Sequence, residues 1–283
     1  MLVKGHRYYL VDAFTDRMFA GNPACVLLGE KLLEEEVMQM IAREFNLSET
    51  AFPFPHDSTN FETANHFHLR WFSPVVEVPL CGHATLATAH ILYSELHNTS
   101  SFLSFTTRSG DLIVSKKRES YVMDFPEGEV TPIDFDTEIL SALHLQGESV
   151  QNMMYCPNPN KLLIEVDNEK RIRDLSPDFI ELIGISHKYK VGSIIVTAVS
   201  DSTGYDFISR NFAPIRGVNE DPVTGSAHVI LGPYWQDKLG KNKLRAYQAS
   251  SRGGFMDIEV KENGRVLLIG TARTIAEGTL LSF

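Results

Sequence analysis

The chain has 283 residues, of which 43% are hydrophobic and 10% aromatic, a composition typical of a globular protein with a substantial core. Asp and Glu outnumber Lys and Arg by 36 to 26, and the resulting net charge of −10 argues against a nucleic-acid or anionic-membrane surface. The sequence begins without a secretory-type apolar run and has no segment of the roughly 20 apolar residues that span a bilayer, so we expect a soluble, cytoplasmic protein.

The first half of the chain contains three periodic segments. Residues 34–47 place apolar side chains at helical spacing opposite a polar face, which predicts an amphipathic helix on the outside of a domain. Residues 65–72 alternate polar and apolar side chains, as a half-buried strand does. Residues 84–97 are apolar over much of the helical circumference, so we expect a helix that is surrounded by a sheet.

The second half repeats this order after a linker. Residues 132–143 are typical of a linker that runs into another outer helix. Residues 205–212 alternate like a strand, and residues 226–239 again have apolar side chains around most of a helix. The second half is therefore predicted to contain the same strand and buried helix as the first.

The two halves also match residue by residue. Residues 67–91 align without gaps on residues 207–231, at an offset of 140 residues and with six identities in 25 positions. Duplication of one unit is the simplest explanation, although two unrelated strand–turn–helix units could match by coincidence. We expect two α+β halves, residues 1–127 and 128–283, in each of which a curved sheet wraps a central helix; the extreme C-terminus is able to cross back to the first half.

The turns that enter the two central helices are small and polar. In the second half, Asp221 has the chemistry of an N-cap, Pro222 suits a first helical position, and residues 224–226 keep the opening turn bare. Residues 81–85 form the corresponding turn of the first half. Under a pseudo-two-fold relation, both turns would face one crevice, where their N–H groups and helix dipoles would hold an anionic substrate.

The sequence lacks several common catalytic signatures. It contains no P-loop, G-x-G-x-x-G, G-x-S-x-G, H-E-x-x-H or C-x-x-C motif, which argues against a nucleotide enzyme, a lipase-type hydrolase and a zinc protease. The three cysteines, Cys25, Cys81 and Cys156, are odd in number and widely spaced. We therefore expect no disulfide framework and a reducing compartment.

Five long motifs are similar to those of one known family. They cover residues 11–28, 41–52, 69–92, 210–235 and 248–260, and include the sequences SETAF, LCGHAT and EDPVTGSAH. In this order they resemble the PhzF-like (phenazine-biosynthesis-like) family, a relative of diaminopimelate epimerase. The resemblance implies a duplicated diaminopimelate epimerase-like fold, a cofactor-free acid/base site between two barrel-like halves, an isomerase activity and a homodimer.

The resemblance also implies roles for individual residues. Glu49 in SETAF matches the family's proton-transferring glutamate, His83 in CGHAT its pocket histidine, and Asp221 in EDPVTGSA its aspartate, so these three are expected to be catalytic. Gly82 and Ser226 match positions that contact the substrate.

The remaining residues of the two helix turns are expected to line the same substrate site; they are Ala84, Thr85, Thr224 and Gly225. Two-cysteine epimerases carry one cysteine in each half, whereas this chain has Cys81 in the first half and an aspartate in the second. This departure argues against racemisation by two thiols.

Physical chemistry alone leaves alternatives open for these residues. A carboxylate can move a proton at carbon when desolvation raises its pKa and the carbanion is stabilised, and Glu49 precedes an apolar run, but an exposed glutamate is the more common case. Asp221 could serve only as a helix cap, and His83 could be either a neutral hydrogen-bond partner near a helix start or a buried histidine satisfied by the backbone. Cys81 could be an activated thiolate, although a small packed residue is the interpretation that we favour.

Three classes of function remain. The strongest hypothesis is a cofactor-independent isomerase that moves a proton on a small carboxylate-bearing metabolite, with no metal, by epimerisation or double-bond isomerisation. A metal-dependent enzyme would use His66 and His68 from one strand face together with Cys81 and His83. A non-catalytic small-anion binding or scaffold protein of the same fold is the third class.

Overall fold

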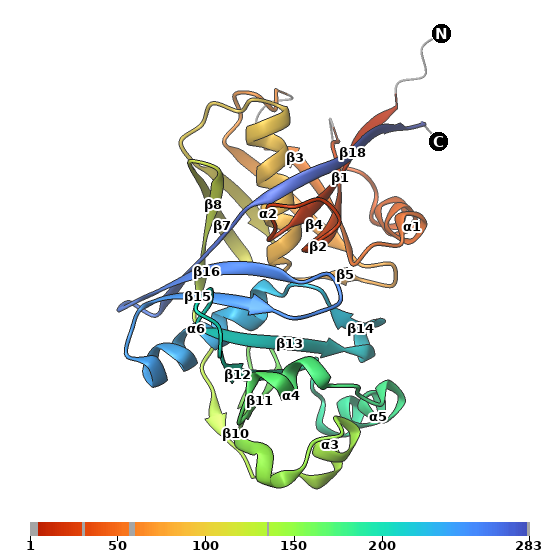
Figure 1. Cartoon of the computed structure of the whole chain (residues 1–283). Coiled ribbons are helices and arrows are strands. Elements are labelled where there is room, and N and C mark those ends of the chain that lie inside the picture. The colour runs from red at the N-terminus through yellow and green to blue at the C-terminus, as the bar shows by residue number, and fades with distance from the viewer. Residues whose placement is uncertain (1–4, 30–31, 57–59, 135, 282–283) are drawn as a thin grey trace. The chain divides into compact units, whose positions relative to one another are not determined.

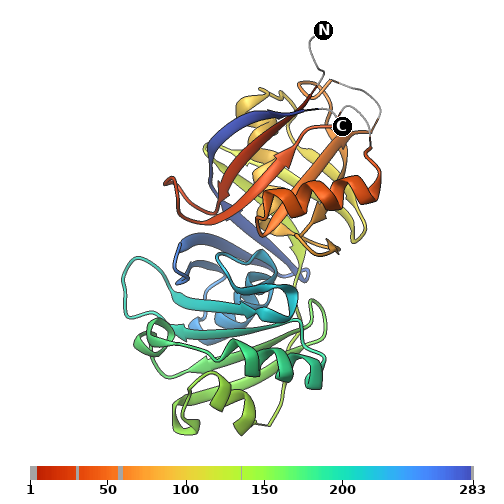
Figure 2. The same ribbon diagram turned by 90° about the vertical axis from the view of Figure 1, so that its right-hand side faces the viewer.

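The structure, a computed structural model, describes residues 5–29, 32–56, 60–134 and 136–281. The chain forms two compact units: unit 1 consists of Met1–Phe125 and Leu267–Phe283, and unit 2 of Pro126–Val266. Figures 1 and 2 show that the first and last strands of the chain lie side by side in unit 1. The C-terminal segment therefore completes the unit that the N-terminal segment begins.

The elements of unit 1 follow one another in this order: β1 (His6–Ala13), β2 (Asn22–Leu27), α1 (Glu35–Phe45), β3 (Glu49–Pro55), β4 (His66–Phe72), β5 (Glu77–Val78), α2 (Gly82–His90), a π-helical turn (Ile91–Glu95), β6 (Leu103–Thr107), β7 (Gly110–Lys117), β8 (Ser120–Pro126) and β18 (Ala272–Leu280). Strand β1 pairs antiparallel with both β2 and β18, β2 runs parallel to β3, and β3 is antiparallel to β4. Strand β4 is parallel to β6, and β6, β7 and β8 continue as an antiparallel meander.

Helix α2 is the centre of unit 1, with strands on several sides (Figure 1). Every residue of α2 is buried, as expected for a helix without a polar face. On β4, the alternate residues Phe67, Leu69 and Trp71 are buried, whereas the residues between them are half-buried. The period of two in this strand therefore directs one row of side chains to the core and the other to the opposite face of the sheet.

The elements of unit 2 are β9 (Thr131–Pro132), α3 (Thr137–Ala142), a 3₁₀ turn (Gly147–Ser149), β10 (Val150–Cys156), β11 (Lys161–Val166), α4 (Glu169–Asp174), α5 (Phe179–Tyr189), β12 (Ser193–Val199), β13 (Phe207–Ala213), a 3₁₀ turn (Pro214–Arg216), β14 (Val218–Asp221), α6 (Gly225–Leu239), β15 (Lys243–Gln248) and β16 (Gly254–Lys261). Strand β17 (Arg265–Gly270) crosses the boundary back to unit 1. The central helix of unit 2 is α6, most of which is buried.

The pairing pattern of unit 2 repeats that of unit 1. Strands β10 and β11 are antiparallel, β11 is parallel to β12, β12 is antiparallel to β13, and β13 is parallel to β15. Arg70 on β4 binds Glu77 on β5 with its guanidinium over Phe72, and Arg210 on β13 binds Glu220 on β14 in the same way. The structure thus confirms the internal repeat and the α+β class.

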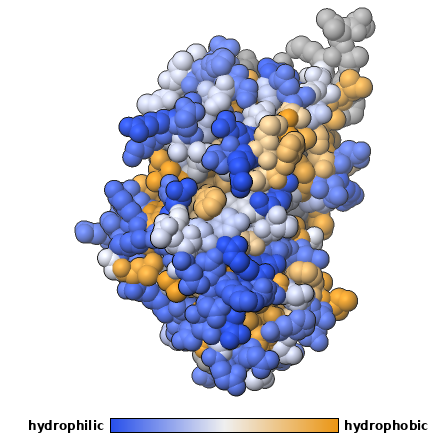
Figure 3. Space-filling view, in the orientation of Figure 1, coloured by the Kyte–Doolittle hydropathy of each residue, from blue (hydrophilic) through white to orange (hydrophobic). Residues whose placement is uncertain are grey.

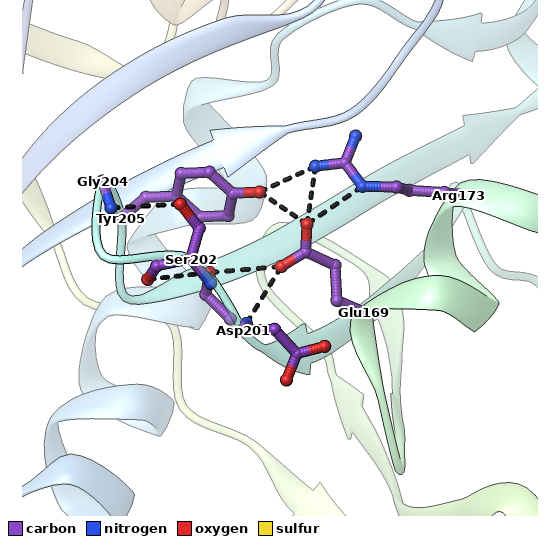
Figure 4. Close-up of polar contacts among 7 residues, drawn as sticks. Glu169, Arg173, Asp201, Ser202, Gly204 and Tyr205 are labelled. Atoms are coloured by element: carbon purple, nitrogen blue, oxygen red, sulfur yellow. Dashed lines mark hydrogen bonds and ion pairs between the residues drawn. The ribbon is translucent and has the colours of Figure 1, made fainter.

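Helix α4 is joined to the loop that follows β12 by one buried carboxylate (Figure 4). Glu169 accepts hydrogen bonds from the Tyr205 hydroxyl at 2.6 Å, from the Arg173 guanidinium at 2.6 Å and from the Asp201 N–H at 3.0 Å. Ser200 donates a further bond to the same carboxylate. Because each carboxylate oxygen is satisfied, the charge can be buried at little cost.

Two sequence predictions about helices need correction. The helix predicted over residues 84–97 begins at Gly82, and its last turn, Ile91–Glu95, is π-helical. Asp221 is not the N-cap of the second central helix: it ends strand β14, where it pairs with Asn211, and Thr224 is the N-cap. Ladder pairing keeps Asp221 extended, so the helix starts three residues later than the Asp-Pro pattern suggests. Helix α1 confirms the predicted outer helix over 34–47.

The displayed face is mostly polar, and no disulfide joins the three cysteines. The face in Figure 3 is mainly hydrophilic, with hydrophobic residues in smaller groups. Cys25, Cys81 and Cys156 are buried and form no disulfide. Within the described ranges, no helix combines the length and the apolar character needed to cross a membrane.

Candidate active site

Glu49 is placed by the sharp return from α1 to the sheet. Helix α1 ends at Asn46, which adopts a left-handed conformation with φ of 50° and donates its N–H to the Ala42 carbonyl. Asparagine tolerates this conformation better than most residues, so the chain can reverse within three residues. Glu49 is then the first residue of β3, in register with Ala24 on the parallel strand β2.

Asn22 is placed by a glycine turn at the start of β2. Gly21 has a φ of +67°, and a Cβ there would lie 2.2 Å from the Ala13 carbonyl oxygen, so only glycine fits. Asn22 follows directly, is fully buried, and pairs with Ala13 across the β1–β2 ladder.

His83 lies in the first turn of α2. The helix begins at Gly82, and its N-cap, Cys81, makes no side-chain cap bond. The Thr85 hydroxyl donates to the Cys81 carbonyl at 2.6 Å, and Ala84 is fully buried. Thr85 is likewise fully buried, so the side chains of Ala84 and Thr85 both pack inside unit 1.

Three side chains from these segments surround the His83 ring. Its Nε2 lies 3.2 Å from Glu49 Oε2, and its Nδ1 lies 3.1 Å from Asn22 Nδ2 and 3.5 Å from Cys81 Sγ. Because the Asn22 amide N–H donates to Nδ1, the ring proton is on Nε2 and is donated to the Glu49 carboxylate. The side chains of His83 and Glu49 are 5% and 18% exposed, so this hydrogen bond is largely shielded from water.

The corresponding segment of unit 2 is organised by Gln248, the last residue of β15. Its amide donates to the Asp221 carbonyl at 2.6 Å and accepts the Thr224 N–H at 2.8 Å. The Thr224 hydroxyl in turn donates to the Asp221 carboxylate at 2.5 Å. The start of α6, with Gly225 and Ser226 as its first two residues, is thereby fixed to the sheet. Sequence reasoning missed Gln248, although it opens the 248–260 motif.

Two buried bases lie near this helix start and were also missed. His228 donates from Nδ1 to the Thr224 carbonyl at 2.7 Å, and burial lowers its pKa to about 4. Lys161 donates to the Ser193 hydroxyl at 2.7 Å. Burial, together with the nearby Arg216 and against the opposing effect of Asp221, lowers the pKa of Lys161 to about 7. A lysine buried beside a serine has no distinctive sequence spacing, so no pattern could have revealed this pair.

The pseudo-repeat shows which residue of unit 2 corresponds to Glu49. Thr50 pairs with Phe72 in unit 1, and Ile194 pairs with Phe212 at the matching position of unit 2. Ser193, which precedes Ile194, therefore occupies the position of Glu49. The two units have the same backbone arrangement but a different side chain at the carboxylate position.

The histidines proposed as metal ligands from sequence separate into two places. His66 and His68 are half-buried on β4, where their rings stack with His56 at centroid distances of 4.8 and 4.6 Å. His83 lies in the core with Cys81 instead. The four-residue set of His66, His68, Cys81 and His83 is therefore wrong.

Comparisons with known proteins agree with this fold. The sequence pattern of the PhzC-PhzF family, described as phenazine biosynthesis-like protein, matches residues 11–278. A relative from Halalkalibacterium halodurans, named an uncharacterized isomerase, is 45% identical over 275 residues, which are 96% of this chain and 97% of that protein. A crystal structure of a PhzF-family protein from Enterococcus faecalis is 41% identical, has a TM-score of 0.88, and is matched over 98% of this chain and 100% of that chain.

A more distant solved structure shows the same fold at low identity. It is a hydroxyproline epimerase from Agrobacterium vitis, matched with a TM-score of 0.62 at 7% identity over 99% of this chain and 93% of that chain. At this identity the likeness concerns the fold alone, and it confirms the expected epimerase-like architecture.

Proposed function

Because the chain belongs to the phenazine biosynthesis-like family, we propose that it is a cofactor-independent isomerase that moves a proton on a small carboxylate-bearing metabolite. The observation that carries the proposal is the shielded hydrogen bond between Glu49 and His83. A carboxylate in this setting has lost much of its hydration and is held in one orientation, as a base that removes a proton from carbon requires.

The proposed reaction needs one proton and no external electrons. Glu49 takes a proton from a substrate C–H, so the C–H bond breaks, an O–H bond forms on Glu49, and the electron pair is delocalised into the substrate. The same O–H then returns the proton to carbon, either at the original position or at the end of a shifted double bond. His83 holds the carboxylate through its Nε2–H, and Asp221 of unit 2 is proposed as a further catalytic group.

The substrate carboxylate is proposed to bind at helix starts. The first turn of α2 at Gly82 and Ala84, and the first turn of α6 at Gly225 and Ser226, carry N–H groups at the positive ends of buried helices. The N–H groups of Thr85 and Thr224 are already donated to the Cys81 carbonyl and to Gln248, so these two residues would contact the substrate through other atoms. That both helix starts hold one substrate stays a prediction. Homodimer formation also stays a prediction.

Solvent exchange tests the proposal directly. The protein is incubated in D₂O with a panel of small 2-hydroxy, 2-amino and unsaturated carboxylates, and deuterium incorporation at carbon is followed by NMR. We expect exchange into at least one compound, and a loss of about 100-fold or more in Glu49→Gln, because general-base catalysis contributes roughly 10²–10⁴-fold.

Glu36→Gln is the matched control, because Glu36 is an exposed carboxylate on α1. This variant should exchange like the wild type. Binding of a carboxylate with no exchange in the wild type would instead favour the non-catalytic anion-binding protein. Undiminished exchange in folded Glu49→Gln would exclude Glu49 as the base.

A further inference from the structure

Three side chains of the candidate active site form a second kind of arrangement. One ligand atom from each of Glu49, Cys81 and His83 lies within 4.8 Å of the other two. Among the described residues, these three are the His, Cys and acidic side chains that lie close enough together to share one metal ion. The group combines a carboxylate, a thiol and an imidazole, which are the three ligand types that Zn²⁺ takes in proteins.

The spacing of these atoms is close to that of a zinc site. Ligand atoms bound to one tetrahedral Zn²⁺ lie roughly 3.3–3.6 Å apart, given Zn–N and Zn–O lengths of about 2.1 Å and a Zn–S length of about 2.3 Å. His83 Nε2 is 3.2 Å from Glu49 Oε2 and 4.0 Å from Cys81 Sγ. Because Sγ lies nearer to Nδ1, at 3.5 Å, than to Nε2, the Cys81 side chain has to rotate about χ1 before all three atoms can bind one ion on the Nε2 side of the ring.

We propose that Glu49, Cys81 and His83 bind a borderline-soft divalent metal ion such as Zn²⁺, and that this ion inhibits the protein. Inhibition rests on the proposed function, because a metal-bound Glu49 cannot take a proton from carbon. Metal binding itself does not depend on that function. The imidazole and the thiolate favour Zn²⁺, Co²⁺ and Cd²⁺ over Mg²⁺ and Ca²⁺, which prefer oxygen ligands.

The protons of the site can rearrange to accommodate the ion. The metal takes the Nε2 lone pair of His83, so the ring proton moves from Nε2 to Nδ1, and the Cys81 thiol loses its proton to solvent. Asn22 then has to accept a hydrogen bond from Nδ1 instead of donating one, which a half-turn of its amide allows. A carbonyl that accepts the N–H of a metal-bound histidine is a common second-sphere arrangement.

The partial exposure of Glu49 gives the ion a way in. The Glu49 side chain is 18% exposed, whereas Cys81 and His83 are buried behind it. The ion would therefore meet the carboxylate first and the sulfur and nitrogen ligands next. An open fourth position would remain for water or an anion, as in zinc sites with three protein ligands.

A test must separate this site from the other histidines of unit 1. The His56 ring, just after β3, stacks with the His66 and His68 rings of β4, and such a group could also hold a transition-metal ion. It contains no sulfur, however. Co²⁺ bound to a thiolate gives a near-ultraviolet charge-transfer band that imidazole ligands alone do not give, so the spectrum identifies the Cys81 site.

The experiment is a Co²⁺ titration of the reduced full chain. We expect a thiolate-to-cobalt band that saturates at one equivalent, persists in His66→Gln/His68→Gln, and is reversed by Zn²⁺. Cys81→Ser should lose the band, and His83→Gln should weaken Co²⁺ binding by more than about 100-fold, since even outer-sphere partners contribute 10–100-fold. Cys156→Ser is the matched control, because Cys156 is also buried but lies in unit 2 and is no part of the group.

A second measurement needs no variant. Zn²⁺ should slow alkylation of Cys81 by iodoacetamide by more than about tenfold while leaving Cys25 and Cys156 unchanged, as read by peptide mass spectrometry. The absence of a thiolate band in the wild type, or a band that survives in folded Cys81→Ser, would overturn the metal site. Metal binding without any effect on solvent exchange would overturn the inhibition alone. A failure to find an exchangeable substrate would count against the proposed function, whereas the cobalt spectrum would still decide whether the metal site exists.

Discussion

Two buried histidines in the central helices are held in opposite tautomers. His83 of α2 accepts a hydrogen bond at Nδ1 from Asn22 and donates from Nε2 to Glu49. His228 of α6 donates from Nδ1 to the Thr224 carbonyl, which leaves its proton on Nδ1. The tautomer of each ring is therefore set by the group that faces Nδ1.

The tautomer of His83 can be changed without touching Glu49. Asn22→Leu keeps a similar volume but removes the donor to Nδ1, so the preference for Nε2–H should be lost. With ¹⁵N-labelled histidine, the wild-type spectrum should show His83 as the Nε2–H tautomer and His228 as the Nδ1–H tautomer. In Asn22→Leu, we expect the signals of His83 to move and those of His228 to stay.

The variant should also lower solvent exchange by at least about tenfold, because Glu49 would no longer be held by a fixed donor. His228 is the internal control, since its bond to the backbone is remote in sequence from Asn22 and belongs to unit 2. A wild-type spectrum with His83 protonated at Nδ1 would contradict the assigned hydrogen-bond direction. An unchanged His83 spectrum in Asn22→Leu would do the same.

For helices and strands, the sequence predicted the features that depend on local periodicity. The outer helix α1 and the strand β4 follow from side-chain spacing within each segment. Strand β13 also forms where it was predicted, but it is buried at almost every position instead of at alternate ones. The bond between Asn22 and His83 joins residues 61 positions apart and depends on the register of β1 with β2, which no local pattern encodes. Asp221 was misassigned as a cap for a related reason: ladder pairing with Asn211 decides its conformation, and that partner lies on another strand.

Helix α4 provides a test of how a short element is held in place. Burial would raise the pKa of Glu169, but the hydrogen bonds from Tyr205, Arg173 and the Asp201 N–H outweigh it and hold that pKa below its ordinary value. The carboxylate therefore contributes stability above the pKa of an unfolded glutamate, near 4.5, and loses it as the pH falls through the lower folded pKa. Glu169→Gln removes this contribution at every pH.

We expect Glu169→Gln to lower the free energy of unfolding of unit 2 by about 1–3 kcal/mol at pH 7, because charged hydrogen bonds to a buried group are lost. Urea unfolding of Trp71→Phe chains, in which Trp235 of unit 2 is the remaining tryptophan, measures this. Lys170→Gln is the control from the same helix: its exposed ion pair with Asp174 should contribute less than about 1 kcal/mol. Equal effects of the two substitutions would contradict the role given to the buried carboxylate.

Each of the two units contains a neutral histidine buried in its central helix. In unit 1, His90 at the end of α2 lies between the Tyr121 hydroxyl and the Thr274 hydroxyl, each at 3.0 Å. Burial lowers the pKa of His90 to about 4; Glu95 opposes this effect, while Lys116 and Arg273 add to it. In unit 2, the pKa of His228 is lowered to about 4 in the same way. Both units thus carry an acid-sensitive group in the same structural element.

Mild acid should therefore destabilise both units. An unfolded histidine takes up a proton near pH 6.5, whereas the folded one does so only near pH 4, so stability is complete above pH 6.5 and is lost progressively as the pH falls from 6.5 to 4. At pH 5, each histidine should reduce the free energy of unfolding by at most about 2 kcal/mol relative to pH 8. The carboxylate of Glu169 acts in a lower pH range and adds to the loss only below about pH 4.5.

Each unit has its own tryptophan, which allows the two contributions to be separated. Trp71 reports on unit 1 with His90, and Trp235 reports on unit 2 with His228. His90→Gln should flatten the pH dependence of the free energy of unfolding between pH 6.5 and 4 for the Trp71 transition alone. His228→Gln should do the same for the Trp235 transition alone. Each substitution should also lower stability at pH 8. A pH slope that survives in both variants would show that other groups control the acid response. If either substitution flattened both transitions, the two units would unfold as one cooperative body rather than as two.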